Sequence, residues 1–419
     1  MLFVRPGRLA DLDALQQMAR TAQPVLHSLP HDRHALEARV ALSEDSFRGE
    51  ADFPGEEFYL FVLEDSATGK LLGTASIVAA AGYSEPFYVF RNDALIHASR
   101  ELHVNRKIHA LTMSHELTGK SRLAGFYIEP GLRGDAAAHL LSRARMMYIA
   151  ANRKRFTNEI FSLLLGVTDD TGVSPFWEAV GRKFFGRNFA DIEVQSGGRS
   201  NTFIAEVMPS YPIYVPLLPE AAQRVLGEPD EHALLAYEIH LDEGFETDRY
   251  VDIFDAGPVL TAQVERIASV RRNETRTVQT AGELLEAVTP PGAVGASGGA
   301  TYMVANNSRG DFRCVLAELP VGRTAGLTAE LAAGLGVGPT ERPAARPAAG
   351  LAAGSSTPPP ADSRAALPLD LQAELLAARI AFAPLDAATR AALDVREGDT
   401  VRCVVLHPDS GPLSAEDAS

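Results

Sequence analysis

The sequence predicts an α+β fold with a mixed, largely antiparallel sheet. Three observations lead to this prediction. Two helical patterns stand near the N-terminus, strand-like segments separated by turn residues follow between residues 58 and 129, and a strand–loop–helix unit comes next. Helices that precede and follow a group of antiparallel strands, without alternating regularly with them, are typical of the α+β class.

The N-terminal elements follow from short local signals. Residues 2–6 (LFVRP) are expected to form a strand. Asp11 is expected to cap a helix over residues 12–22, and a second helix is expected over roughly residues 32–49.

The next part of the chain carries most of the strand signal. Residues 58–64 and 71–82, joined by the turn DSATGK, form a strong hairpin pattern. Four more strand-like runs follow the hairpin: FYVFRN, ALIHAS, KIHALTM and RLAGFYIE. Because such short runs are joined by short turns, we expect one antiparallel sheet here.

The stretch YIEPGLRGDAAAHLLSRARMMYIAA, residues 127–151, begins as a strand and continues as a helix with apolar residues at helical spacing on one face. A strand at 159–167, a helix at 174–185 and a strand at 202–208 are expected after it. This order is also that of the acyl-CoA N-acyltransferase (GNAT-like) fold. In that fold, pantetheine and pyrophosphate lie at the loop between the fourth strand and the following helix.

Composition narrows the function classes. The net charge of −15 argues against a general affinity for nucleic acid or anionic membranes. No apolar run approaches the roughly 20 residues of a membrane span. The only cysteines are Cys314 and Cys403, which argues against a disulfide framework or a cysteine metal cluster. We expect a cytoplasmic protein with no metal site and no membrane partner.

A chain of 419 residues is long for one domain, so we expect a division. Residues 338–366 are rich in Pro, Ala, Gly and Ser, which is typical of a disordered linker or insertion. The predicted parts are a GNAT-like domain at 1–258, a β-rich extension at 259–337, this linker, and a small helix–turn–strand segment at 367–419 that completes the β-rich region.

A series of motifs carries a more specific resemblance. In order along the chain they are SLP, FVLEDS, SEPFYVFRN, HAS, LTG, SPFW, AEVMPSYPIYVPLLP and GFETDRYVDIFDAGP. With these motifs the chain resembles the arginine N-succinyltransferase family, and within it the alpha-type chains of the two-subunit arginine/ornithine form. The motifs cover residues 1 to about 320 and a part near the C-terminus.

The resemblance implies an acyltransferase that moves succinyl from succinyl-CoA to the α-amine of L-arginine or L-ornithine. Direct attack of the amine on the thioester needs no covalent enzyme intermediate. No tightly bound cofactor is expected, since succinyl-CoA is a co-substrate. A homologous beta-type subunit, self-association or both are the expected partners. The alternative is a non-catalytic or regulatory subunit whose sister chain carries the chemistry.

For the acyl carrier, the resemblance points to the strand-to-helix unit. In this superfamily, the strand's backbone pairs with pantetheine and an R-x-x-G-x-G/A loop wraps the pyrophosphate. The matching positions are Phe126, Tyr127, Ile128, Arg133, Gly134, Asp135, Ala136 and Ala138.

The loop departs from the family pattern. Ala136 and Ala138 stand where the glycines belong, and Asp135 puts a carboxylate where phosphates would lie. An alanine keeps the N–H but disfavours positive φ. The alternative is an ordinary strand-to-helix connection with Asp135 as N-cap, and the sequence leaves both interpretations open.

The family's acid/base is a histidine in a G-x-x-H-P motif. Counting from Gly227 in LGEPDEHALLAYEIHLDEGF, that position is Asp230, and His232 lies two residues on. A small local shift would let His232 serve, whereas a carboxylate is a weaker base at neutral pH. His232 and Asp230 are therefore the candidate catalytic residues. The alternative for His232 is a solvated residue at a helix start.

Candidate acceptor-binding residues come from three segments. Ser28 lies in the loop between the first two helices, which faces substrate in this fold. In SEPFYVFRN, Glu85 suits a guanidinium and Arg91 suits a carboxylate. Asp252 and Asp255 are further candidates for a cationic side chain. The alternatives are a structural Glu85–Arg91 pair and a pair of turn-capping aspartates.

Overall fold

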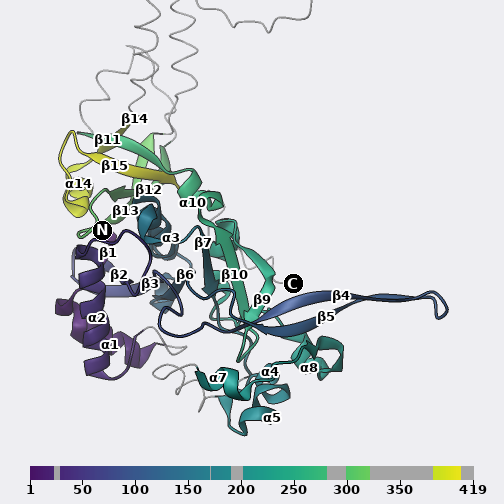
Figure 1. Ribbon diagram of the computed structural model, residues 1–419. Coiled ribbons are helices and arrows are strands. Elements are labelled where there is room, and N and C mark those ends of the chain that lie inside the picture. The colour runs from purple at the N-terminus through teal and green to yellow at the C-terminus, as the bar shows by residue number, and fades with distance from the viewer. Residues whose placement is uncertain (23–28, 170, 190–201, 281–298, 321–380, 407–419) are drawn as a thin grey trace, which may run out of the picture.

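One continuous 15-stranded sheet runs through the part of the chain that the structure describes. The computed structural model describes residues 1–22, 29–169, 171–189, 202–280, 299–320 and 381–406 (Figure 1). The strand order is β14-β11-β15-β12-β13-β1-β2-β3-β6-β7-β10-β9-β4-β5-β8. Most neighbouring strands are antiparallel, and helices lie against the sheet, which confirms the predicted α+β class.

The N-terminal part begins with four antiparallel neighbours. They are β1 (Leu2–Pro6), β2 (Phe58–Asp65), β3 (Leu71–Val78) and β6 (Ser121–Ile128). The two predicted helices are present as α1 (Leu12–Thr21) and α2 (Arg33–Arg48); α2 lies against β1 and β2, and α1 packs on α2 (Figure 1). The predicted cap of α1 is wrong, because the Asp11 carboxylate pairs with Arg5 at 2.7 Å and accepts no hydrogen bond from α1.

The centre of the sheet contains a switch of direction. β7 (Glu159–Leu163) runs parallel to β6, and then antiparallel pairing resumes. The strands beyond β7 are β10 (Pro258–Gln263), β9 (Glu246–Asp252), β4 (Val89–Ser99), β5 (Val104–Ser114) and β8 (Ile213–Tyr214). The runs FYVFRN and ALIHAS belong to the single strand β4. With β5 it forms a long hairpin that projects from the body of the molecule (Figure 1).

Five strands near the C-terminus extend the sheet past β1. They are β11 (Glu274–Thr280), β12 (Gly299–Asn306), β13 (Cys314–Pro320), β14 (Ala381–Leu385) and β15 (Thr400–Val405), with helix α14 (Ala387–Leu393). β13 pairs with β1, so both parts share one sheet. The domain boundaries stay a prediction. β10, which starts at the expected boundary of 258, pairs with β7 of the N-terminal part. The predicted linker at 338–366 lies outside the described residues.

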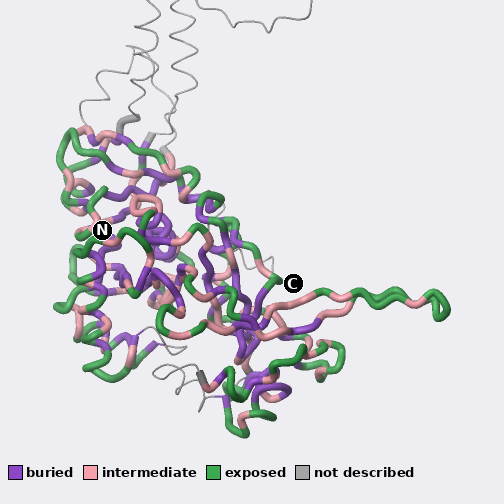
Figure 2. The backbone as a smooth tube through the Cα atoms, viewed as in Figure 1, coloured by how far each residue is buried: buried purple, intermediate pink, exposed green. Residues whose placement is uncertain are grey.

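Helix α3 (Ala136–Ala151) is buried on nearly every side (Figure 2). The expectation of an amphipathic helix is therefore wrong. α3 packs against the sheet, α9 (Leu234–Asp242) and α10 (Ala268–Arg271). Even Arg143 and Arg145 are only 2% and 1% exposed, and each has a buried polar partner, Glu243 for Arg143 and Ser142 for Arg145. The apolar pattern located the helix, but it could not reveal that a second set of elements covers the polar face.

Shorter helices lie beside β9, β4 and β5. They are α4 (Pro175–Ala179), α5 (Gly181–Phe185), α7 (Thr202–Val207) and α8 (Glu220–Arg224). The predicted helix at 174–185 is thus interrupted at Val180. The predicted strand at 202–208 is wrong, since α7 occupies it. Ile204 and Met208 are both buried and stand four residues apart, which suits a helix packed on a core. No helix in the described ranges is long and apolar enough to cross a membrane.

Candidate active site

The parallel strands β6 and β7 separate partway along their length. Their pairing runs from Ser121↔Ile160 to Leu123↔Ser162 and then stops. β6 continues to Ile128, still paired with β3 on its other edge. The β7-facing backbone of residues 124–128 therefore has no neighbouring strand. The strands open a split. The carbonyls of Ala124 and Gly125 accept from the side chains of Arg145 and Thr74 at 3.3 and 3.2 Å, while the edge of residues 126–128 can offer backbone donors and acceptors to an extended ligand.

A β-bulge at Gly125 lies where the split opens. The pairing of β6 with β3 shifts between Ser76↔Ala124 and Thr74↔Tyr127, so one extra residue stands on β6. Gly125 takes φ +61°, a left-handed conformation that glycine adopts without steric penalty. The bulge bends β6 away from β7. Sequence analysis missed it, although a glycine inside the strand run RLAGFYIE was an available signal.

The loop after β6 leads directly into α3. Asp135 caps the helix, and its carboxylate accepts a hydrogen bond from the Ala137 N–H at 3.0 Å. Ala136 and Ala138 lie within the helix, so neither is strained by the missing glycine. Gly134 has ordinary negative φ and open space around its Cα. Asp135 therefore has the hydrogen bonding of an N-cap residue, as the alternative interpretation expects. The backbone amides of Gly134 and Ala136 have no acceptor in the described part of the protein.

The remaining predicted carrier residues lie along β6 and its loop. Ile128 is buried against α3, Phe126 packs on the same core, and Tyr127 faces α1 and α2 on the opposite side. The Arg145 guanidinium lies 5.9 Å from the Phe126 ring centroid. Arg133 is half-buried at the end of the one-turn helix Pro130–Leu132. The structure thus brings the strand and the loop together at one edge of the split.

Asp230 and His232 form one polar unit beside β7. The Asp230 Oδ1 atom lies 2.9 Å from the His232 Nδ1 and 3.0 Å from the His232 backbone nitrogen. The aspartate side chain is 9% exposed and the histidine side chain 37%. Asp230 is thus held in place while the far side of the imidazole stays open to solvent or substrate.

Backbone pairing places this unit at the split. The Asp230 N–H donates to the Leu165 carbonyl at 2.9 Å, just past the end of β7. Leu164 bonds to β10. Successive strand residues bond to opposite sides, so the Leu165 carbonyl faces the β6 side. The segment carrying Asp230 and His232 therefore lies across the opening between β6 and β7.

Asp252 and Asp255 build the turn after β9. Asp252 Oδ1 accepts from the backbone nitrogens of Phe254 and Asp255 at 2.7 and 3.1 Å. Asp255 accepts from Gly257 at 2.7 Å and from Gly166 at 2.8 Å. Burial raises the pKa of Asp252. These contacts are those of turn-forming residues, and the Asp255 contact fixes the backbone next to Leu165.

The other acceptor-binding candidates lie elsewhere. Arg91, on β4, pairs with Asp93 at 2.8 Å and with Glu116, and these hydrogen bonds raise its pKa. A guanidinium already held by two carboxylates is poorly placed to bind a third. Glu85 is half-buried in the loop before β4. Ser28 lies outside the described residues.

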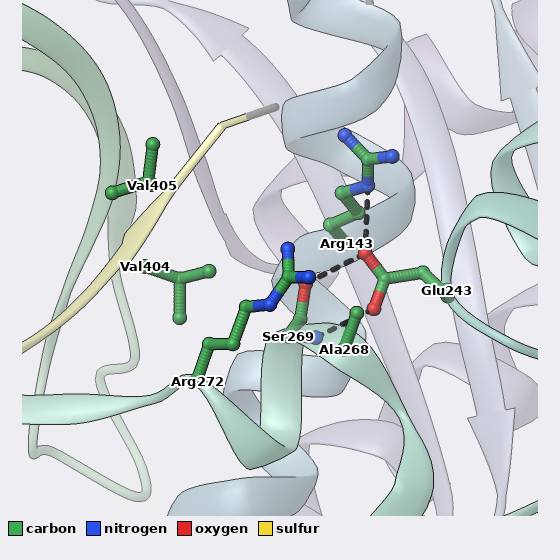
Figure 3. A pocket seen from close by; sticks show the side chains of 7 residues that line it. All are labelled: Arg143, Glu243, Ala268, Ser269, Arg272, Val404 and Val405. Atoms are coloured by element: carbon green, nitrogen blue, oxygen red, sulfur yellow. Dashed lines mark hydrogen bonds and ion pairs between the residues drawn. The ribbon is translucent and has the colours of Figure 1, made fainter. Parts of the chain in front are cut away.

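A buried ion pair fixes the elements behind the site (Figure 3). Arg143 of α3 lies 2.8 Å from Glu243, and each side chain is 2% exposed. Glu243 also accepts from the Ser269 backbone and hydroxyl at 2.7 and 2.8 Å. The cavity beside them has about 10 Å³ of free volume, room for one water at most. It is structural, not a substrate site.

Comparisons with known proteins agree with this geometry. The family model for the arginine N-succinyltransferase beta subunit matches residues 2–269, and the model for its C-terminal domain matches residues 287–342. The arginine N-succinyltransferase subunit alpha of Pseudomonas aeruginosa is 44% identical over 76% of this chain and 91% of its own length. The arginine N-succinyltransferase of Yersinia pseudotuberculosis is 37% identical over 75% and 89%.

A solved structure has the same fold. It is that of arginine/ornithine succinyltransferase subunit AI from Pseudomonas aeruginosa, with a TM-score of 0.72 and 35% identity. The match covers 97% of this chain and 98% of that one. Together with the family model and the relatives, this match shows that the chain belongs to the arginine N-succinyltransferase family of acyltransferases.

Proposed function

We propose that the chain transfers a succinyl group from succinyl-CoA to the α-amine of L-arginine, with L-ornithine as the other candidate acceptor. The observation that carries this proposal is the split between β6 and β7 with Asp230 and His232 across its opening. The names of the relatives support the same activity and do not favour the alternative of a non-catalytic subunit.

The acyl carrier would lie along the free edge of β6. Backbone groups of Phe126, Tyr127 and Ile128 would pair with pantetheine. The loop at Arg133, Gly134 and Asp135, with Ala136 and Ala138 in the first turn of α3, would face the pyrophosphate. The free amides of Gly134 and Ala136 and the positive end of the α3 dipole favour an anion there. The negative charge of the Asp135 carboxylate would repel the pyrophosphate and weaken its binding.

The chemistry assigns His232 as the base. With Nδ1–H donated to Asp230, Nε2 presents its lone pair and takes a proton from the substrate ammonium. The neutral amine then attacks the thioester carbonyl, and a C–N bond forms as the carbonyl becomes an oxyanion. Backbone N–H groups at the bulge of β6 would stabilise that charge. Collapse of the intermediate breaks the C–S bond, and the departing thiolate takes up the proton that the nitrogen loses as the amide forms. The imidazolium then returns its proton to the solvent.

Asp230 would keep the imidazole in the reactive tautomer and stabilise the imidazolium that forms. Asp255 would fix the backbone of Gly166, the residue after Leu165, to which the Asp230 amide is bound. Of the predicted acceptor ligands, Ser28 and Glu85 stay the first candidates, whereas Arg91, Asp252 and Asp255 would have to exchange a present hydrogen bond for one to the substrate. A homologous beta-type subunit or a second copy of the chain is the proposed partner.

Product analysis tests the function. The purified chain is incubated with succinyl-CoA and L-arginine, and the product is fragmented by mass spectrometry. We expect N-succinylarginine with the succinyl group on the α-nitrogen. Repeating the assay with L-ornithine in competition shows the preferred acceptor. A product formed only from a different amine would contradict the proposal.

A further inference from the structure

Two arginines on the α1–α2 side of the sheet have no polar partner in the described residues. Arg39 comes from α2 and Arg122 from β6. Neither side chain makes a hydrogen bond or ion pair with any described residue, although both are partly buried. The neighbouring exposed arginine of α2, Arg48, by contrast pairs with Glu44 at 2.8 Å.

Pairing across the sheet fixes where Arg122 stands. Phe58, Val78, Arg122 and Phe161 form one row across β2, β3, β6 and β7. Leu123, the next residue of β6, belongs to the core against α3, so Arg122 faces the other side. The row lies one residue before the end of the β6–β7 pairing, which stops at Leu123.

Both guanidinium groups rest on aromatic rings. Arg39 lies 4.8 Å from the centroid of Phe58, and Arg122 lies 5.2 Å from the centroid of Phe87. Such stacking holds a guanidinium in a fixed plane while leaving its N–H groups free. One strand, β3, lies between Phe58 and Arg122 in the row, so the two residues stand two strand spacings of about 4.8 Å apart. Long side chains span that distance, so the two cations lie in one region.

The electrostatic environment agrees with this placement. Burial lowers the pKa of both arginines, and the charge of Arg39 lowers that of Arg122 further. The Asp252 carboxylate acts on Arg122 in the opposite direction, but without an ion pair between them. The Nε atom of Arg122 is out of contact with solvent and has no acceptor among the residues that the structure describes.

An unpaired buried cation is unfavourable in a fold, and two like charges close together are more so. Such an arrangement is typical of a site that an anionic ligand completes. Two planar guanidinium groups match a carboxylate, whose two oxygens accept paired N–H donors.

We propose that Arg39 and Arg122 bind a substrate carboxylate at the point where β6 and β7 separate. This inference rests on the proposed function, in which both substrates carry a carboxylate. Succinyl-CoA has it at the free end of the succinyl group, and arginine has its α-carboxylate. Arg122 pairs with Phe161, four residues or about 13 Å along the strand from Leu165, where Asp230 docks. The carboxylate would thus be held on the sheet while the reacting end points toward His232.

The test uses Arg39→Met and Arg122→Met, with Arg48→Met as the matched control. Each variant is assayed with succinyl-CoA against acetyl-CoA, and with L-arginine against agmatine, so that each pair differs by the carboxylate. We expect KM for one carboxylate substrate to rise roughly 10- to 100-fold, and KM for its carboxylate-free analogue to stay unchanged. Arg122→Lys keeps the charge but loses the planar guanidinium with its paired N–H donors, so its KM for the carboxylate substrate should lie between those of the wild type and Arg122→Met.

A loss of selectivity against acetyl-CoA would assign the pair to the succinyl carboxylate, and a loss against agmatine would assign it to the acceptor. Either result supports the proposal. Since the Met variants remove an unpaired charge, we also expect their Tm not to fall. A lower Tm with unchanged KM values would mark the arginines as structural and overturn the proposal.

A binding measurement separates this proposal from the proposed function. Succinate alone should raise the Tm of the wild-type chain and not that of Arg122→Met. If no turnover occurs in the wild type but succinate protection is lost in the variants, the activity is wrong and the carboxylate site stands. If succinate raises the Tm of both Met variants as much as that of the wild type, and their KM values equal those of the wild type, the carboxylate site is wrong.

Discussion

His232 Nδ1 lies 2.9 Å from Asp230 Oδ1, and the aspartate amide is bound to the Leu165 carbonyl past the end of β7. Sequence analysis offered these two residues as alternatives for one role. The structure makes them partners, in which the buried carboxylate orients the more exposed imidazole. A histidine oriented by a carboxylate is a better base than either residue alone.

Replacing His232 should reduce turnover without unfolding the chain. We expect His232→Gln to lower kcat by about 10²- to 10⁴-fold, the usual contribution of a general base. Asp230→Asn should lower kcat as well, because the amide favours the wrong tautomer. Steady-state thiol release measures both, and His97→Gln on the exposed hairpin is the control. Full activity in His232→Gln would remove the residue from the mechanism.

Removing the charge of Asp135 should improve binding of the acyl carrier. Asn is as good an N-cap as Asp, so Asp135→Asn keeps the start of α3 and removes only the carboxylate near the phosphates. We expect the Kd for CoA, measured by calorimetric titration, to fall by roughly 2- to 5-fold. Asp135→Ala separates the effects, since loss of the cap should lower stability by about 1 kcal/mol. Weaker binding in Asp135→Asn would contradict a phosphate site at this loop.

Breaking the Arg143–Glu243 pair should destabilise the fold strongly. Glu243→Ala leaves the guanidinium of a 2%-exposed arginine without its buried partner. We expect the free energy of unfolding to fall by about 3–5 kcal/mol in denaturant titrations. The control Glu220→Ala removes a carboxylate that is 83% exposed and should change it by less than about 0.5 kcal/mol. Equal effects would mean that the Arg143–Glu243 pair does not hold α3 in place.

The buried His240 and the half-buried His139 should make stability fall in acid. Burial, together with the charge of nearby arginines, Arg143 among them, lowers the pKa of His240 to about 3 and that of His139 to about 4. The unfolded chain takes up these protons near pH 6.5, while the folded chain resists until pH 3–4. Stability is therefore full above about pH 6.5 and declines as the pH drops toward 4.

The matching experiment follows unfolding between pH 7 and 4. In His240→Gln, the decline should be shallower by one proton, about 1.4 kcal/mol per pH unit. An unchanged slope would show that His240 is protonated in the fold at these pH values.

Most of the regular elements could be predicted from the sequence. The strands β1, β2 and β3, with α1, α2 and α3, have local patterns that agree with their surroundings, although the expected Asp11 cap of α1 is not formed. α7 was predicted as a strand because an alternating apolar run fits both periods when it is short. The packing of Ile204 and Met208 on a core decides for the helix, and no local signal reveals that packing.

The site was less predictable because it depends on distant pairings. The docking of Asp230 on Leu165 leaves no local pattern, and Gly125 marks the bulge of β6 without revealing that β6 leaves β7 there. Arg122 stands at the start of the strand run RLAGFYIE, directly after Lys120 and Ser121, so its charge was no signal, and its meaning depends on Arg39, 83 positions away in the sequence. Asp252 and Asp255 were read from their charge, whereas their hydrogen bonds belong to a turn.

The most direct test is thiol release from succinyl-CoA by the purified chain, with and without L-arginine, in the wild type and in His232→Gln. We predict arginine-dependent release by the wild-type chain alone and its near loss in the variant. If release appears only when a beta-type subunit is added, or if the variant is as fast as the wild type, then the split between β6 and β7 in this chain is not the working active site.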